Sequence, residues 1–169
     1  MVPCTVLLSG ETEKFPAEEL RFRPAAYGIY VRDDQILLGR SKFTGRWDIP
    51  GGGVEAWETI EEGMIREFWE ETGIRVAAIR LVDFRESFIA FIHHPFHSLR
   101  YYYAVNGLEP ANETPCPDAE ELSSVQWVRL ADINPGECAP GDYRLITRML
   151  TKEGGRTDGA DGQQNFVLG

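Results

Sequence analysis

The segment 59–72 constrains the fold more than any other part of this 169-residue chain, because it predicts one helix with well-defined ends. It contains no proline, and Thr59 followed three residues later by Glu62 forms the pattern of a capping box, in which each residue satisfies a free backbone amide of the other. Gly73 comes next, and glycine readily takes the left-handed conformation that ends a helix. We therefore predict a helix over residues 59–72.

One face of this predicted helix carries three carboxylates. Glu67, Glu70 and Glu71 lie at positions i, i+3 and i+4, which are neighbours on a helix surface. Like charges at this spacing repel each other, and a hard divalent cation such as Mg²⁺ or Mn²⁺, which prefers oxygen ligands, would relieve the repulsion. A solvated acidic face is the alternative interpretation of the helix taken by itself.

A second face of the helix is apolar, which predicts that it packs on a sheet. The residues of this face recur at every fourth position and are Ile60, Met64, Phe68 and Thr72. A further apolar pair, Ile65 and Trp69, lies away from the carboxylates. This pair suggests a contact with another part of the chain or with a second subunit in a homodimer.

The remaining segments predict a chain built mainly from strands. Apolar runs predict strands over residues 25–31, 35–40, 74–92, 99–105 and 123–130, and a closing amphipathic helix over 142–150. Gly28, inside the first of these strands, indicates the close approach of a neighbouring element. We expect an edge strand over residues 2–8 and loops over 9–19 and 93–97.

The region around the predicted helix resembles the signature of the Nudix hydrolases, G-x5-E-x7-R-E-U-x-E-E-x-G-U, in which U is a bulky apolar residue. The specified positions are matched in order by Gly52, Glu58, Arg66, Glu67, Phe68, Glu70, Glu71, Gly73 and Ile74. Nine matched positions over 23 residues are a far more specific signal than a lone glycine motif. A looser similarity, through RWDIPGG before the motif and a tryptophan-containing strand after it, extends over residues 23–133.

The resemblance implies a fold. Nudix hydrolases are α/β proteins with an α/β/α sandwich and a mixed β-sheet, so we expect that architecture here. The length fits a single domain over residues 1–150, in which 1–21 contribute an edge strand and a loop. Residues 151–169 are expected to form a glycine-rich C-terminal tail.

The resemblance also implies which residues carry the chemistry. It makes Glu67, Glu70 and Glu71 ligands of Mg²⁺, with Mn²⁺ as an alternative. The backbone carbonyl of Gly51 is implied as a further metal ligand. Glu67 is in addition the candidate general base, and Arg66 would orient it.

Residues outside the motif complete the predicted site. The pattern acid-Leu-x-x-Val-x-Trp is similar to the Nudix loop from which another glutamate often reaches the metal site, and this favours Glu121, then Glu120, as the rival base. Two exposed loop acids are the alternative interpretation. By residue type and position, Arg40, Arg46 and Trp47 are candidates for contacts with the phosphates and base of a substrate.

The reaction that the resemblance implies is hydrolysis of a pyrophosphate linkage in a nucleoside diphosphate derivative. A (d)NTP pyrophosphohydrolase is the first choice by elimination, because the additional motifs of coenzyme A, NADH and diadenosine polyphosphate hydrolases are not evident. An ADP-ribose or nucleotide-sugar pyrophosphatase is the alternative. A catalytically inactive nucleotide-binding regulator is the alternative from a different class of protein.

The composition limits the partners and the compartment. A net charge of −10 argues against binding to nucleic acid or to an anionic membrane, and the small nucleotide expected as ligand is what the Nudix resemblance implies. No apolar run approaches the ~18 residues of a membrane span, and no basic residues precede the apolar run near the N-terminus as in a signal peptide.

Three cysteines outside any CxxC pair favour reduced thiols and a cytoplasmic location. The histidines of segment 93–97 match no common zinc spacing.

Overall fold

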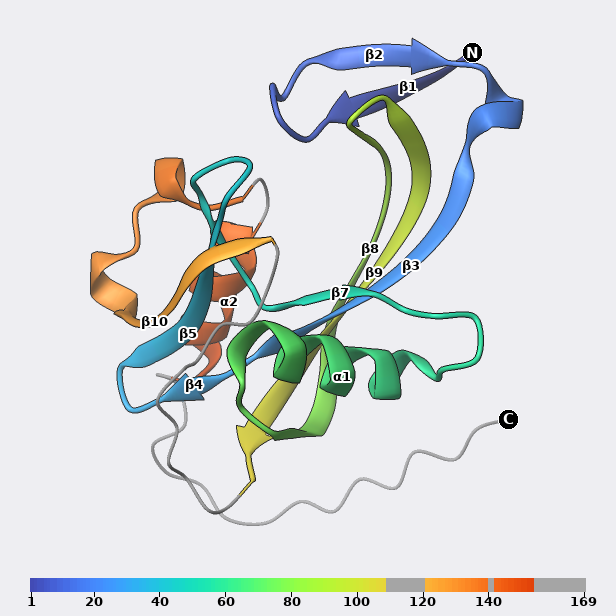
Figure 1. Cartoon of the computed structure of the whole chain (residues 1–169). Coiled ribbons are helices and arrows are strands. Elements are labelled where there is room, and N and C mark those ends of the chain that lie inside the picture. The colour runs from blue at the N-terminus through green and yellow to red at the C-terminus, as the bar shows by residue number, and fades with distance from the viewer. Residues whose placement is uncertain (109–120, 140–141, 154–169) are drawn as a thin grey trace.

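Figure 1 shows the computed structural model of the chain, which describes residues 1–108, 121–139 and 142–153. Within these ranges the chain forms two sheets, two α-helices and three short 3-10 helices. The predictions for Glu120 and for the tail beyond residue 153 lie outside the described residues.

The larger sheet is mixed. Its strands are β1 (Val2–Val6), β2 (Thr12–Phe15), β3 (Arg21–Ile29), β7 (Gly51–Gly53), β8 (Val76–Phe91) and β9 (His94–Gly107). They lie side by side in the order β2-β1-β8-β9-β3-β7. The pairings of β1 with β8 and of β3 with β9 are parallel, and the other pairings in this sheet are antiparallel.

The smaller sheet is antiparallel and packs beside the larger one (Figure 1). It consists of β4 (Val31–Arg32), β5 (Gln35–Ser41), β6 (Trp47–Asp48) and β10 (Leu122–Arg129), with β10, β6 and β4 all pairing with β5. The short 3-10 helices are η1 (Ala17–Glu19), η2 (Leu130–Asp132) and η3 (Pro135–Glu137). The strands predicted over 35–40, 74–92, 99–105 and 123–130 are present with shifted ends. The strand predicted over 25–31 is instead divided at Tyr30 between β3 of the larger sheet and β4 of the smaller sheet.

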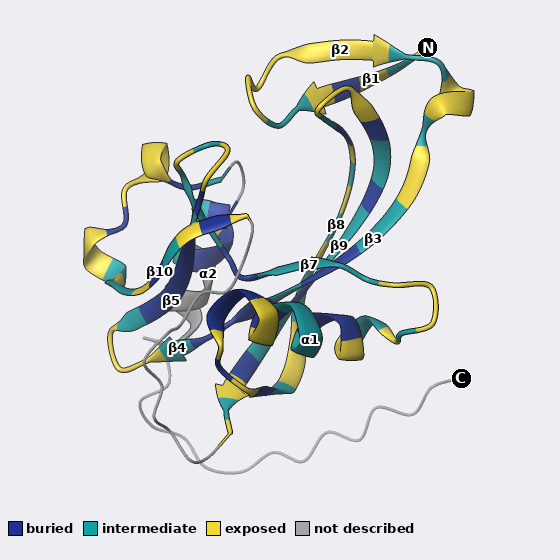
Figure 2. Cartoon of the chain, viewed as in Figure 1, coloured by how far each residue is buried: buried dark blue, intermediate teal, exposed yellow. Residues whose placement is uncertain are grey.

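The helices α1 (Ile60–Thr72) and α2 (Asp142–Glu153) lie on opposite sides of β3. Side chains alternate between the two faces of a strand. Ala26 of β3 belongs to the core cluster that contains Phe68 of α1, whereas Ile29 belongs to the cluster that contains Leu145 of α2. Figure 2 shows the buried residues concentrated where the helices face the strands. The predicted α/β class with helices on both sides of a mixed sheet is confirmed.

Helix α1 begins and ends as its sequence predicts. The Thr59 hydroxyl accepts a hydrogen bond from the Glu62 amide at 3.2 Å, and the Glu62 carboxylate accepts one from the Thr59 amide at 2.9 Å. Gly73 ends the helix with a φ of 72°. The predicted apolar face is largely buried, through Met64, Phe68 and Thr72.

Gly28 of β3 allows α1 to lie close to the sheet. A β-carbon at this position would lie 2.6 Å from Cδ2 of Phe68 and 3.2 Å from Sδ of Met64. Both side chains are fully buried in a packed core, so neither has room to move aside. The close approach predicted from Gly28 is confirmed.

The N-terminal region differs from its prediction. Strand β1 is not an edge strand, because it pairs with β2 on one side and with β8 on the other. The segment 9–19, predicted as a loop, contains β2 and η1. Three of the four residues of β2 are exposed, so no alternation of apolar and polar residues marks this strand in the sequence.

The histidine segment also differs from its prediction as a loop. Ile92 and His93 form the turn, both with positive φ, and β9 begins at His94. The two strands stay paired up to Phe91 and His94, which leaves only a tight hairpin turn between them. His97 lies within β9, with its Nε2 atom 2.6 Å from a carboxylate oxygen of Glu86.

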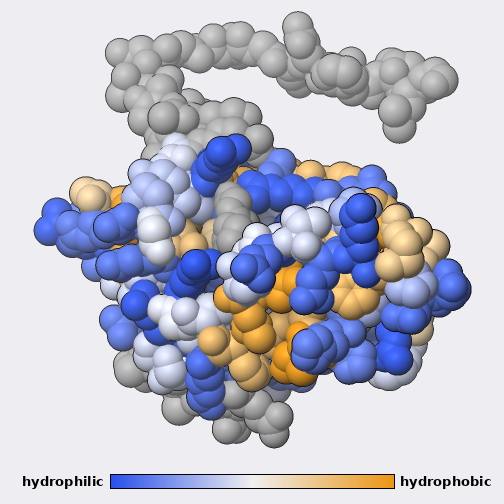
Figure 3. Space-filling view, turned by 90° about the horizontal axis from the view of Figure 1, so that it is seen from above, coloured by the Kyte–Doolittle hydropathy of each residue, from blue (hydrophilic) through white to orange (hydrophobic). Residues whose placement is uncertain are grey.

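Several large apolar side chains lie on the surface. Trp69, of the pair considered for a subunit contact, is 48% exposed, whereas Ile65 packs against the core. Figure 3 shows apolar side chains gathered in the middle of the face seen from above, with hydrophilic residues around them. No helix within the described ranges is long and apolar enough to cross a membrane.

We expect Gly28→Ala to lower the free energy of unfolding by about 1–3 kcal/mol, because the added methyl group overpacks the contact with Phe68. Urea denaturation measures this change. The matched control is Gly136→Ala, where the new β-carbon would meet its nearest neighbour at an ordinary distance of 3.7 Å. Equal stability of the two variants would contradict the close contact between β3 and α1.

Candidate active site

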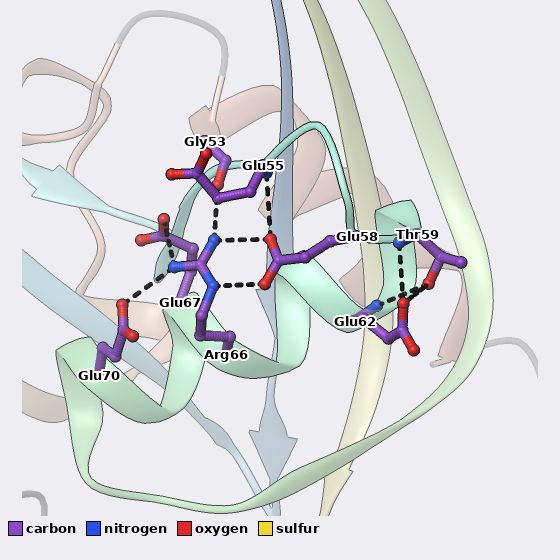
Figure 4. Close-up of polar contacts among 8 residues, drawn as sticks. All are labelled: Gly53, Glu55, Glu58, Thr59, Glu62, Arg66, Glu67 and Glu70. Atoms are coloured by element: carbon purple, nitrogen blue, oxygen red, sulfur yellow. Dashed lines mark hydrogen bonds and ion pairs between the residues drawn. The ribbon is translucent and has the colours of Figure 1, made fainter.

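Arg66 of α1 lies at the centre of a network of carboxylates (Figure 4). Its guanidinium donates to both carboxylate oxygens of Glu58, from Nε at 2.6 Å and from Nη2 at 2.9 Å. Nη1 donates to Glu67 at 2.9 Å and to Glu70 at 3.0 Å. Nη2 also donates to the backbone carbonyl of Gly53 at 3.0 Å. One side chain therefore connects the loop before α1 to the acidic face of the helix.

The pair of Arg66 and Glu58 stays ionised across the ordinary pH range. The hydrogen bonds from Arg66, helped by the Glu55 amide, lower the pKa of Glu58 to about 2. The same hydrogen bonds raise the pKa of Arg66 above its already high ordinary value. A bidentate pair of this kind fixes the geometry as well as the charge, so Glu58 holds the guanidinium in place toward Glu67 and Glu70.

Glu67 is partly buried against the glycine-rich strand β7. A β-carbon on Gly52 would collide with the Glu67 carboxylate, so a side chain at this position would force that carboxylate to move. Burial raises the pKa of Glu67, and the hydrogen bond from Arg66 acts in the opposite direction. The carboxylate is thus more basic than an exposed glutamate while remaining oriented by Arg66.

Glu71 is the most buried acid of the helix, with 9% of the residue exposed. The amide of Gly51 donates a hydrogen bond to Glu71 Oε2 at 2.8 Å. Burial is the main cause that raises the pKa of Glu71 to about 8, and the Gly51 amide opposes that rise. Nearby charges on Glu67, Glu121 and Asp48 raise it further. The structure therefore places the Gly51 backbone directly against one of the predicted metal ligands.

The loop acid Glu121 reaches the same site from the start of β10. Its charge raises the pKa values of Glu67 and Glu71 and that of Asp48, which places its carboxylate near all three. The backbone carbonyl of Glu121 accepts a hydrogen bond from the Lys42 amide at 2.8 Å, which fixes the chain beside the end of β5. The structure thus brings Glu121 and Glu71 to the same cavity, and the catalytic role of Glu121 stays a prediction.

Asp48 on β6 is a member of the site that the sequence analysis did not single out. Burial, followed by the nearby charge of Asp142, raises its pKa to about 7, and Arg46 lowers it. The sequence feature that could have identified Asp48 is its position in the segment WDIPGG, directly before the glycine-rich turn. Its contact with the helix acids depends on how β6 folds back along β5, which spacing along the chain does not show.

A cavity of about 410 Å³ lies beside this acidic face. Its lining includes the acids Glu71, Glu121, Asp48 and Asp142 together with aromatic residues. The phenylalanines in this lining are Phe43, Phe91 and Phe96. A lining with both acids and aromatic residues suits a ligand that carries a metal-bound anionic group and a planar apolar group.

The three residues predicted to contact substrate fall in two places. Arg46 lines the cavity. Arg40 instead lies over the ring of Trp47, with 4.6 Å between its guanidinium carbon and the ring centroid, and neither residue is part of the cavity lining. Basic and aromatic residue types in this loop were visible in the sequence, but their orientation was not.

The donor atoms of the site are carboxylate and backbone oxygens, as Mg²⁺ and Mn²⁺ prefer. Within the described part of the chain, no three acidic, histidine or cysteine side chains converge into a ready-made metal cage. Glu67 and Glu70 instead bind Arg66, and Glu71 binds the Gly51 amide. Mg²⁺ normally uses one or two carboxylates together with water and substrate phosphates, so this arrangement fits such an ion.

The chain belongs to the Nudix hydrolase family, because the family model of the NUDIX domain matches residues 21–149. It is 54% identical to a MutT-like protein from Streptomyces ambofaciens over 50 residues, which cover 29% of this chain and 32% of that protein. It is 36% identical to the NAD-capped RNA hydrolase NudC from Photobacterium profundum over 140 residues, covering 81% of this chain and 47% of that protein. The chain thus spans about a third and about half of the lengths of these two relatives.

The fold is also that of solved Nudix structures. The crystal structure of an ADP-ribose pyrophosphatase from Streptococcus suis matches with a TM-score of 0.56 and 18% sequence identity, covering 82% of this chain and 96% of that chain. The predicted membership of the Nudix family is confirmed.

Asp142, the first residue of α2, is a buried carboxyl at the edge of the cavity, with 7% exposed. It accepts hydrogen bonds from the Ile49 amide at 3.5 Å and from the Tyr102 hydroxyl at 3.4 Å. Burial raises its pKa to about 6, and Arg100 is the first of the groups that oppose this rise. A carboxyl with a higher pKa in the folded chain favours folding while it is protonated, and this contribution is lost as pH rises from about 4 to about 6.

We expect Asp142→Asn to remove this loss of stability. Above pH 6 the variant should be more stable than the native chain by up to about 3 kcal/mol, the free-energy equivalent of a shift of about two pKa units. Urea denaturation between pH 4 and pH 8 measures the difference. Glu137→Gln, at an exposed position, is the control. The same pH dependence in the native chain and in Asp142→Asn would contradict a buried carboxyl.

Proposed function

We propose that this Nudix hydrolase is a divalent-metal-dependent pyrophosphohydrolase of nucleoside diphosphate derivatives, with (d)NTPs as its first-choice substrates. The observation that carries the proposal is a set of acids at the cavity: Glu71, Glu121 and Asp48 line it, and Glu67 is close enough for its charge to raise the pKa of Glu71. Glu67 and Glu71 come from α1, Glu121 from the start of β10, and Asp48 from β6. Burial raises the pKa values of Asp48, Glu67 and Glu71, and acids with raised pKa values beside a cavity are typical of catalytic sites.

We assign the metal ligands to Glu67, Glu70, Glu71 and the backbone carbonyl of Gly51. A bound Mg²⁺ or Mn²⁺ supplies a Lewis acid for phosphoryl oxygens and lowers the pKa of a bound water. The side chains that supply oxygens are held ready for this task, since Arg66 binds Glu67 and Glu70. The absence of a β-carbon at Gly51 lets its backbone lie against Ala26 and Tyr27 of β3, and from there its amide donates to Glu71.

Glu67 is our candidate for the general base. Partial burial raises its pKa, which makes the carboxylate a better proton acceptor than an exposed glutamate. Arg66 acts as a positioning residue, because it holds Glu67 while its own place is fixed by Glu58. Glu121 is the rival base, since it lines the same cavity as Glu71.

The substrate is proposed from the shape and charge of the cavity. Arg46 borders it and is the candidate for a phosphate contact, whereas Arg40 and Trp47 would reach substrate only after moving apart. An ADP-ribose or nucleotide-sugar pyrophosphatase is the second candidate, favoured by the fold shared with the Streptococcus suis ADP-ribose pyrophosphatase. The net charge of −10 favours a small nucleotide over nucleic acid.

Two further proposals concern the whole molecule. The exposed ring of Trp69 supports a homodimer contact on α1, and a monomer in sedimentation equilibrium would remove that proposal. The buried free thiols of Cys4 and Cys138 fit a reducing cytoplasmic location.

Incubation with Mg²⁺ and a panel of dNTPs, ADP-ribose and nucleotide sugars tests the activity. Triphosphates should give a nucleoside monophosphate and pyrophosphate, resolved by chromatography. A monophosphate with a sugar phosphate would move the assignment to the second candidate. No turnover of any compound, with and without Mg²⁺ or Mn²⁺, would contradict the proposal and favour a binding regulator.

We expect Glu67→Gln to lower kcat by about 100-fold to 10,000-fold, because the variant loses a metal ligand and the candidate base together. The control is Glu61→Gln, an exposed position in the first turn of the same helix, which should keep native kcat. Thermal melts should show both variants folded. Native kcat in Glu67→Gln would show that this carboxylate takes no part in the chemistry.

A further inference from the structure

Strand β8 carries phenylalanines on the side that faces away from the cavity. Ser87 and Ile89 line the cavity. Because side chains alternate along a strand, Phe84 and Phe88 point to the opposite side, where both are exposed. A strand with one covered face normally turns its apolar residues toward that face and its polar residues outward. Residues 83–88 reverse this order, which indicates a contact surface on their outer side.

Two neighbouring strands continue this apolar surface. In the pairing of β8 with β9, Phe88 is opposite His97, and in the pairing of β9 with β3, His97 is opposite Phe22. The ring centroids of Phe88 and His97 are 4.7 Å apart, and those of His97 and Phe22 are 5.6 Å apart. A further ring contact joins Phe84 to Tyr101 at 5.0 Å. Paired residues share a side of the sheet, and the outer face thus consists of Phe22, Pro24, Phe84, Glu86, Phe88, His97, Leu99 and Tyr101.

Helix α1 covers one end of these strands. Ala26, two residues beyond Pro24 on β3, is fully buried in the core cluster that contains Phe68 of α1. Phe22, two residues before Pro24, is exposed. Figure 1 shows β3, β8 and β9 extending past α1 toward the N-terminal strands. Among the described residues, the outer face is therefore the part of this side of the sheet that α1 leaves open.

The outer face is nearly neutral on a strongly acidic chain. Glu86 is the acid of this face, and one of its carboxylate oxygens lies 2.6 Å from Nε2 of His97. The chain as a whole carries a net charge of −10, so two copies repel each other, least of all where an apolar face meets its like. A basic partner would instead be drawn to the acidic surfaces of the chain. The face therefore suits a partner that is itself acidic and makes apolar contact.

The size of the outer face agrees with what a dimer needs. An aromatic side chain buries roughly 150–250 Å² when it is fully covered. Because Phe22, Phe84 and Phe88 are 63%, 46% and 40% exposed, these three rings together offer roughly 300 Å². The other residues of the face add to this area. Two copies would bury about 1,000 Å² in total, which is near the lower limit of specific interfaces.

We propose that the outer face is a contact between two copies of this chain that are related by a two-fold axis. In such a contact each copy presents the same residues, so the phenylalanines of one copy pack on those of the other. Offset or edge-to-face contacts between these rings add to the stabilisation by apolar burial. The inference goes beyond the proposed function, because the outer face lies on the opposite side of the strands from the cavity.

The outer face is distinct from the surface around Trp69. Trp69 lies on α1, whereas the outer face lies where the strands extend past this helix. A dimer through the outer face also supports the cavity, because Phe96 and Arg100 project to the cavity side of β9, the strand that carries His97 on its outer side. The partner covers the side of the strands that lies opposite the cavity, so the dimer leaves the cavity accessible.

Sedimentation equilibrium tests the inference. We expect the native chain to dimerise with a dissociation constant of about 1–100 µM, as suits an interface near the lower size limit. Phe22→Ser combined with Phe88→Ser should weaken dimerisation about 10-fold or more. Leu8→Ser, at an exposed apolar position in the turn after β1, is the matched control and should keep the native constant. A native chain that stays monomeric up to about 1 mM would overturn the inference. Loss of the dimer in Trp69→Ser, with none in the phenylalanine variant, would do the same.

A second measurement uses the native chain and so does not depend on the folding of a variant. The backbone amide signals are followed by two-dimensional NMR while the protein is diluted from about 10-fold above to about 10-fold below its dissociation constant. We expect the signals of residues 84–88 and 97–101 to shift, and the indole N–H signal of Trp69 to stay in place. Shifts confined to α1, or none at all, would overturn the inference.

Discussion

The network around Arg66 is the interaction on which the site depends. Three glutamates on one helix face repel each other, and the Arg66 guanidinium offsets this by binding Glu67 and Glu70. Its second contact, the bidentate pair with Glu58, anchors the loop before α1. The helix is in turn seated on the sheet through Gly28, so the position of the carboxylates relative to the cavity follows from packing as well as from charge.

The buried acids of the site lower the stability of the fold, and the same burial gives them the raised pKa values that favour function. Burial raises the pKa values of Glu71 to about 8 and of Asp48 to about 7, so both would ionise more readily if the chain unfolded. A cation beside these acids would offset that cost. A β-carbon at Gly51 would collide with the backbone of Ala26 and Tyr27 on β3, and one at Gly52 would collide with the Glu67 carboxylate. Such conflict between local stability and chemistry is expected at a functional site.

The sequence predicts the helix and its acidic face well, because these depend on local chemistry. Thr59, Glu62 and Gly73 define the helix ends through contacts within a few residues. Strand β2 could not be predicted, since its side chains are exposed and only its backbone pairing defines it. For the same reason Asp48 was missed, and the stacking of Arg40 on Trp47 was not foreseen: both depend on how β5 and β6 pair. Long-range pairing, which spacing along the chain does not encode, accounts for these differences.

The central claim is that the carboxylates held by Arg66 and by the Gly51 amide form a site for a divalent cation. Titration with Mn²⁺, followed by the electron paramagnetic resonance signal of the free ion, tests it most directly. The native chain should remove free Mn²⁺ from solution, and Glu70→Gln and Glu71→Gln should bind it much more weakly than Glu61→Gln. Mn²⁺ binding that is unchanged in Glu70→Gln and Glu71→Gln, or absent from the native chain, would contradict the account.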